Sequence, residues 1–186
     1  MKRLLLFVAI AMTSLAQGQT FNDVYIGGSL EKVISQFKAK GYTYKMKLEV
    51  GALMEGKFNF EEVELYILVT PKTKQVFKVA AYFSEATGWT SLKDSYFRYK
   101  EALTNKYGQP DYEEEKFITP YYDGDGYELS AVKNEKASYS SAWIGKGNLN
   151  IAVEISKTGQ LKLIYENRSA MELKRREQEE LQMRNL

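Results

Sequence analysis

Apolar residues recur with helical spacing in two segments of the chain. Segment 29–40 has one apolar face, Ser29 can cap its start, and Gly41 follows its end. This face consists of Leu30, Val33, Ile34 and Phe37. Segment 91–106 carries a larger stripe and ends before Gly108, and Ser91 with Asp94 is predicted to form a capping box. That stripe consists of Leu92, Tyr96, Tyr99, Leu103 and Tyr107.

Elsewhere apolar and polar residues alternate, which is typical of strands with one buried face. The predicted strands after the first helix are 42–50, 52–58, 63–69 and 76–83. Phe77, Val79, Ala81 and Phe83 are expected to share a face of the last of these strands. The predicted strands after the second helix are 112–118, 127–132, 138–144, 149–155 and 161–165. Short turns between such strands predict antiparallel meanders.

The two halves of the chain, about 20–88 and 89–169, repeat the order of a helix followed by a meander. Each half has a similar turn, and 72–75 and 157–160 share three of four residues. We therefore expect a single α+β domain over 19–169, built from two helix-plus-antiparallel-meander repeats. The helices are expected to pack on one face of the sheet or sheets.

The two ends of the chain differ from this domain. Residues 1–18 have a basic start, an apolar run too short to span a bilayer, and a small polar end, which predicts a secretory signal peptide. The mature protein is then expected to be periplasmic or secreted, with no membrane span. Segment 170–186 is rich in charge, and the pair Glu172 and Arg176 suits a helix. We expect a charged helical tail, exposed to solvent or paired with a partner.

Composition excludes several kinds of chemistry. The sequence contains no cysteine and no histidine, so disulfides, thiol nucleophiles, Cys/His zinc sites and histidine-based triads are ruled out. The formal net charge of +2 is too small to favour nucleic acid as a partner. No catalytic residue and no cofactor motif is identified, so we expect a protein that binds no cofactor, and the sequence does not favour an enzyme.

Two short motifs resemble known sites. Ser29 to Lys32 fits S-x-x-K and Lys157 to Gly159 fits K-T-G, but the S-D-N motif of serine β-lactamases is missing and the K-T-G lies in a turn. Asp123 and Asp125 resemble the start of a calcium loop, although the later EF-hand positions do not fit. These two aspartates remain weak metal candidates beside the alternative of a simple turn.

Aromatic residues are the more informative excess, with 14 Tyr, 9 Phe and 2 Trp. Tyrosine favours recognition surfaces because it offers contact area and a hydroxyl at little entropic cost, but it also suits half-buried sheets. A binding site is expected on a Tyr-rich sheet face or on the loop 121–127. The candidate binding residues are Tyr121, Tyr122, Asp123, Asp125, Tyr127, Trp89 and Trp143.

The overall pattern resembles small exported proteins of Bacteroides-type bacteria, a group without an assigned activity. The resemblance rests on the signal ending Ala16-Gln17-Gly18, the helix 29–40 with its Lys-Gly-Tyr end, the segment 65–83 around Pro71, and the run 121–127. The tandem layout is also similar to the β-lactamase inhibitor protein, where two repeats form a concave sheet that grips a protein. This resemblance implies a binding protein, and the absence of cysteine departs from that inhibitor.

The sequence thus favours a non-catalytic exported binding module, protein-binding or inhibitor-like, whose ligand is an unknown protein or glycan. One alternative is a small hydrolase of glycans that uses carboxylates and tyrosine. The other is a structural homodimer of the cell envelope, formed through sheet edges or the tail 170–186.

Overall fold

The computed structural model describes residues 20–184, and the predicted signal peptide over 1–18 lies outside these residues. Within them, the chain forms a large antiparallel sheet and four helices, so the α+β prediction is confirmed. The helices are α1 (Leu30–Ala39), α2 (Trp89–Tyr107), α3 (Glu128–Lys133) and α4 (Arg168–Arg184). A hairpin of β1 (Thr20–Phe21) and β2 (Val24–Tyr25), which the sequence patterns missed, precedes α1.

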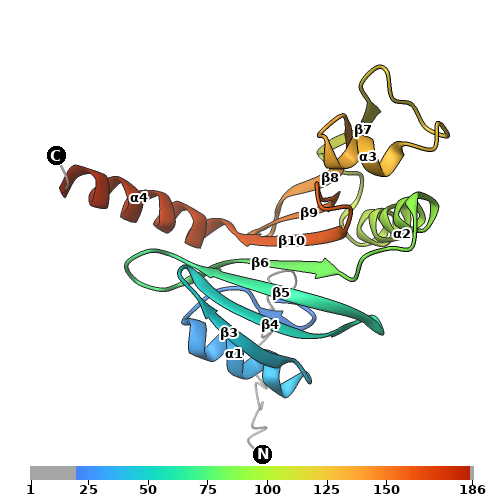
Figure 1. Cartoon of the computed structure of the whole chain (residues 1–186). Helices are drawn as coiled ribbons and strands as arrows, with labels where there is room; N and C mark the ends of the chain where they lie inside the picture. Colours follow the sequence, from blue (N-terminus) through green and yellow to red (C-terminus); the bar gives the residue numbers. More distant parts are fainter. Residues whose placement is uncertain (1–19, 185–186) are drawn as a thin grey trace, which may run out of the picture.

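The sheet has eight strands in the order β3-β4-β5-β6-β10-β9-β8-β7 (Figure 1). The strands of the first half are β3 (Thr43–Leu48), β4 (Gly51–Phe58), β5 (Glu61–Val69) and β6 (Val76–Phe83). Those of the second half are β7 (Tyr112–Phe117), β8 (Ala137–Lys146), β9 (Leu149–Ile155) and β10 (Leu161–Asn167). The final strand of each half, β6 and β10, therefore pair at the centre of the sheet.

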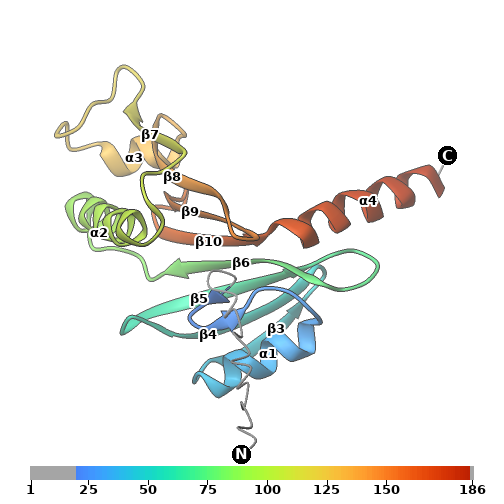
Figure 2. The ribbon, with the colours of Figure 1, turned by 180° about the vertical axis from the view of Figure 1, so that it is seen from behind.

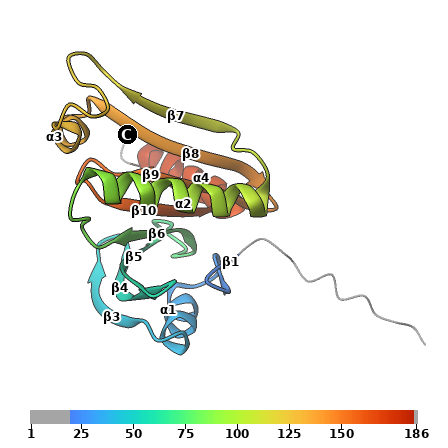
Figure 3. The ribbon, with the colours of Figure 1, turned by 90° about the vertical axis from the view of Figure 1, so that its right-hand side faces the viewer.

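One hydrophobic cluster joins helices and strands. On β5, Leu65 and Ile67 are fully buried, while the alternating Glu64 is exposed, as the period of two predicts. Phe37 of α1 and Tyr96 of α2 are also fully buried in this cluster. Figure 3 shows α2 crossing in front of β9 and β10, which it contacts. Burial of these side chains is the main source of the stability of the fold.

The predicted strand at 127–132 is wrong, because this segment forms α3. The N–H of Ala131 donates to the carbonyl of Tyr127, and that of Asn134 donates to Ser130. The Glu128 carboxylate accepts the N–H of Gly124, which fixes the preceding turn. So short an apolar run fits a strand or one helical turn equally well, which explains the error.

The predicted capping box at the start of α2 is also wrong. The helix begins at Trp89 after Gly88, and no side chain caps its first turn. Instead, the Ser91 hydroxyl donates to the carbonyl of Gly88. Ser29 does cap α1, because its hydroxyl accepts the N–H of Lys32 at 3.4 Å.

A register shift near the start of β6 changes which side chains face the core. The pairing of β5 with β6 shifts between Leu68 and Val69. As a result Val76 joins the core cluster, whereas Phe77 does not and lies beneath the ammonium group of Lys174 at 4.7 Å from the ring centroid. The prediction that Phe77 shares a face with Val79 is therefore wrong.

The charged tail forms α4, which projects from the end of β10 in both opposite views (Figures 1 and 2). Its first turns contact β6 and β10, and Glu177 is only 3% exposed. The tail is therefore helical, as predicted, and its contacts anchor it to the sheet, with Glu177 as its buried residue. Within residues 20–184, no helix has both the length and the apolar character needed to cross a bilayer.

Candidate functional site

The strand residues that alternate with the core residues form a second face, which we call the outer face of the sheet. One row of this face crosses all eight strands, and each member lies directly opposite the next. The row consists of Met46, Leu53, Tyr66, Ala80, Ile164, Ala152, Ala142 and Tyr112. A sheet face that met only water would carry polar residues there.

The exposure of the row varies from its ends to its centre. Met46 and Tyr112, at the two edges of the sheet, are 53% and 51% exposed. Ala80 and Ile164, on the two central strands, are buried although they lie outside the core cluster. The row thus presents apolar surface that is shielded in the middle by larger neighbours on the same face.

Two tyrosines of the outer face lie on neighbouring strands, Tyr66 on β5 and Tyr82 on the central strand β6. The rings of Tyr66 and Tyr82 lie 5.1 Å apart at 66°, an edge-on arrangement. The Lys162 ammonium lies 5.2 Å from the Tyr82 ring centroid and 2.6 Å from a Glu154 oxygen. Burial lowers the pKa of Lys162, but the hydrogen bond and charge of Glu154 together with Tyr82 outweigh burial and raise the pKa above its ordinary value. The centre of the outer face is therefore aromatic and carries a charged lysine.

Several carboxylates of the outer face are paired with lysines, whereas Glu64 accepts the Tyr66 hydroxyl at 3.3 Å. Besides the pair at Lys162, Lys78 lies 3.0 Å from Glu166, and Lys45 lies 2.8 Å from Glu55. A glycoside hydrolase needs two carboxylates that flank one bond, with one of them protonated at the pH of the reaction. The carboxylates in these ion pairs are instead already engaged by lysines.

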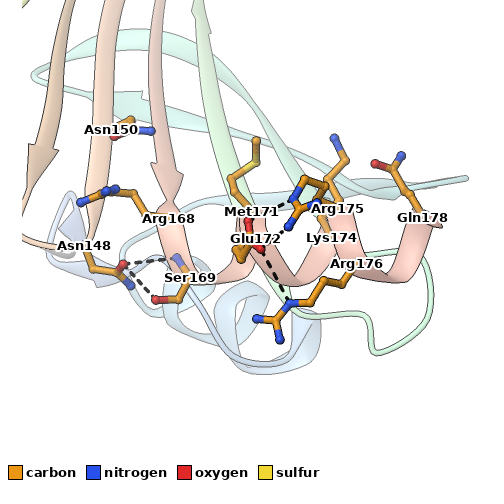
Figure 4. Close-up of a pocket in the computed structure, with 10 residues that line it drawn as sticks. All are labelled: Asn148, Asn150, Arg168, Ser169, Met171, Glu172, Lys174, Arg175, Arg176 and Gln178. Atoms are coloured by element: carbon orange, nitrogen blue, oxygen red, sulfur yellow. Dashed lines mark hydrogen bonds and ion pairs between the residues drawn. The ribbon is translucent and has the colours of Figure 1, made fainter. Parts of the chain in front are cut away.

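A groove of about 790 Å³ lies at one end of the outer face, between α4 and the hairpin of β8 and β9 (Figure 4). Asn148 and Asn150 line it from the strands, and Arg168, Lys174 and Arg175 line it from α4. Arg175 forms ion pairs with Glu172 and Glu179 along the helix. The groove is therefore polar and mostly basic.

A second groove of about 670 Å³ lies at the other end of the outer face, beside the turn between β9 and β10. Tyr82 and Lys162 line it from the central strands, and Ser156 and Thr158 line it from the turn. The exposed Ile118 adds apolar surface at its rim. Tyr82 lines this groove and also belongs to the aromatic centre of the outer face, so the two are continuous.

Five of the seven residues predicted to bind a ligand lie in one loop. Tyr122 and Tyr127 are 65% and 66% exposed, and Tyr121 is half-buried. The Asp125 carboxylate accepts the N–H groups of Tyr122 and Tyr127 at 3.0 and 2.7 Å. Asp125 therefore holds the loop in shape, and the two exposed rings remain accessible.

Asp123 is engaged with α2. Its carboxylate accepts a hydrogen bond from Trp89 Nε1 at 3.1 Å and forms an ion pair with Lys93. The hydrogen bonds of Lys93 and Trp89 lower the pKa of Asp123. Within the described residues, no group of three or more carboxylates, cysteines or histidines is arranged to hold a metal ion.

This arrangement predicts the response to calcium. We expect millimolar CaCl₂ to leave the melting temperature of the protein unchanged, because binding at Asp123 would have to displace Lys93 and Trp89. Differential scanning fluorimetry with and without EDTA measures this directly. A calcium-dependent rise that disappears in the variant Asp123→Asn would contradict the prediction.

Trp143 lies apart from the other predicted residues. It is completely buried, and its Nε1 donates to the carbonyl of Gly108 at 2.7 Å. A partner at the surface has no access to this ring. The structure therefore gives Trp143 a role in packing, whereas Trp89 is half-buried against the core and lies beside the 121–127 loop.

Comparison with protein-family models, curated proteins and solved structures gives no match to this chain. Its function must therefore be argued from its own geometry. Sequence reasoning had indicated a Tyr-rich sheet face but did not single out Tyr66 or Tyr82. The alternation along 63–69 contained the signal, because Tyr66 occupies a position facing away from the core.

Proposed function

We propose that this protein is an exported, non-catalytic module that binds another protein through the outer face of its sheet. The observation that carries the proposal is the apolar and aromatic row that crosses all eight strands. Aromatic anchors surrounded by polar neighbours are typical of protein interfaces. Tyr66 and Tyr82 are the anchors, and the ion pairs at Lys162 and Lys78 form the polar surroundings.

The alternatives receive less support. Glu55, Glu154 and Glu166 of the outer face are each paired with a lysine, which disfavours their use as the carboxylate pair of a glycan hydrolase. Both edge strands carry charge, with Lys45 and Lys47 on β3 and Glu113, Glu114 and Lys116 on β7. Charged edges oppose the pairing of strands between two copies, so a homodimer built through the sheet edges is disfavoured.

We also propose that the domain consists of two repeats with α1 and α2 on one face of the sheet. The turns after β5 and β9 support this reading because they share their hydrogen bonds. The N–H of Thr70 donates to the carbonyl of Gln75, and the N–H of Gln75 donates to the Thr70 hydroxyl. Ser156 and Gln160 make the same two bonds in the second half. In this layout the outer face is left open for a partner.

The test is capture of a partner by tagged protein comprising residues 19–186, followed by affinity measurement with the purified partner. The double variant Tyr66→Ala/Tyr82→Ala is expected to bind about 30-fold more weakly, because truncation of aromatic anchors typically costs 2 kcal/mol or more. The matched control Tyr122→Ala removes an exposed ring from the 121–127 loop. It should bind like the unchanged protein.

Two results would reverse the assignment. Loss of binding in Tyr122→Ala, with full binding in the double variant, would move the contact surface to the loop. A captured protein whose affinity is unaffected by either change would exclude the outer face. Circular dichroism of each variant establishes that the fold is intact, so that weaker binding reports the contact and not unfolding.

A further inference from the structure

The turn between β5 and β6 binds a carboxylate of α4. Glu177 accepts the N–H of Lys72 at 2.6 Å, the N–H of Thr73 at 3.2 Å and the Thr73 hydroxyl at 2.5 Å. The Lys72 ammonium forms an ion pair with Glu180, which lies three residues further along the helix. This turn therefore recognises two glutamates spaced i and i+3 on one helix.

The turn between β9 and β10 offers a Lys-Thr pair in the same order before its closing glutamine, and it is one residue shorter because Pro71 has no counterpart. Lys157 and Thr158 correspond to Lys72 and Thr73, since both pairs precede the glutamine that closes the turn. Within residues 20–184, the N–H groups of Lys157 and Thr158 meet no protein acceptor. The hydroxyl of Thr158 bonds within the turn, to Ser156 and Gln160.

The Lys157 ammonium is free to change partners. It lies 3.8 Å from Glu135, and the two side chains are 75% and 73% exposed. Ion pairs at such exposure contribute little to stability, so a carboxylate from another molecule can replace Glu135. The charge of Lys157 then complements an acidic partner as Lys72 complements Glu180.

The groove beside this turn has room for one face of a helix. The groove of about 670 Å³ runs from the turn to Tyr82 and Ile118. At the first turn the corresponding contact is made by α4, where Lys174 covers Phe77. The apolar surface of Ile118, which is 45% exposed, supplies a contact of that kind at the second turn.

We propose that the turn formed by residues 156–160 binds a helix of the partner protein through two glutamates spaced i and i+3. The N–H groups of Lys157 and Thr158 receive the first carboxylate, and the Lys157 ammonium receives the second. The inference rests on the proposed function, since it places the partner at one end of the outer face. It adds that the partner segment is a helix with two glutamates, the same chemistry by which α4 contacts the turn between β5 and β6.

The test uses the intact protein and a synthetic peptide with the sequence of residues 168–184, which carries this pair of glutamates. In ¹H–¹⁵N NMR spectra we expect the amide signals of Lys157 and Thr158 to shift as the peptide is added. A peptide with both glutamates changed to glutamine should bind about tenfold more weakly, because charge-assisted hydrogen bonds are lost. The protein variant Lys157→Ala should show a similar loss, while Lys106→Ala, at an exposed lysine of α2, should not.

The outcomes separate this inference from the proposed function. Shifts confined to Lys72 and Thr73 would mean that the peptide only displaces α4, and this would overturn the inference. Absence of any shift at Lys157 and Thr158 would overturn it as well. In both cases the outer face would still be judged by the Tyr66→Ala/Tyr82→Ala variant, because that test uses the captured partner and does not depend on the turn.

Discussion

The variant Trp143→Ala is expected to lower the free energy of unfolding by about 3–5 kcal/mol, the usual cost of removing a large aromatic side chain from a core. Trp143 is completely buried, and it pairs across the sheet with Ile151, which is also buried. Its loss leaves a cavity and removes the donor to the carbonyl of Gly108. Urea denaturation followed by circular dichroism measures the effect.

Trp143→Phe is the matched control, because it keeps most of the ring while it removes the indole N–H. We expect a smaller loss of about 1–3 kcal/mol, since the carbonyl of Gly108 would lose its donor. A Trp143→Ala protein with unchanged stability and lost partner binding would show instead that the ring is a contact residue. That result would contradict the burial described above.

Helices α1 and α2 and most strands followed from the sequence because their patterns are long. The apolar face of α1 spans about two turns, and Ser29 caps it as predicted. The alternation of β5 runs over nine residues and specifies which side chains enter the core. Segments of this length bury enough surface for the periodic pattern to determine the local structure.

The errors occur where local signals are short or where distant residues decide the structure. The six residues of α3 are too few to reveal a period. Phe77 is buried outside the core cluster because the pairing of β6 with β5 shifts register. The sequence of β6 by itself does not show such a shift. Glu177 is buried because it bonds to Lys72 and Thr73, about a hundred residues earlier in the chain.

The sequence predicted the type of candidate site but not its position on the fold. The excess of tyrosine indicated a recognition surface, but the choice of surface depends on strand order, because β6 pairs with β10 across the chain. This pairing brings Ala80 opposite Ile164 and completes the apolar row between the two halves. Single strands contribute only one member each to the row, so its continuity is a property of the folded sheet.

The variant Glu177→Ala is expected to lower the free energy of unfolding by about 2 kcal/mol and to detach the distal part of α4. The carboxylate satisfies the N–H groups of Lys72 and Thr73 and the Thr73 hydroxyl, and its removal leaves these donors without their acceptor. Hydrogen exchange of the α4 amides should accelerate more than that of the sheet. The control Glu179→Ala, on an exposed side of α4, should change neither quantity by a comparable amount.

The stabilisation by Glu177 should also depend on pH. Burial raises the pKa of this carboxyl, but the bonds from Thr73 and Lys72 outweigh burial and leave the pKa below its ordinary value of 4.5. A group whose pKa is lower in the folded state stabilises that state above its unfolded pKa, and this contribution is lost as the pH falls through the folded value. The difference in unfolding free energy between the unchanged protein and Glu177→Gln should therefore be constant near pH 7 and shrink below pH 4.5.

Urea denaturation of both proteins from pH 7 to pH 3 measures this difference, in which the titration of Glu180 and the other shared carboxylates largely cancels. A difference that stays constant across this range would show that the Glu177 carboxylate is not the group that fastens α4 to the sheet.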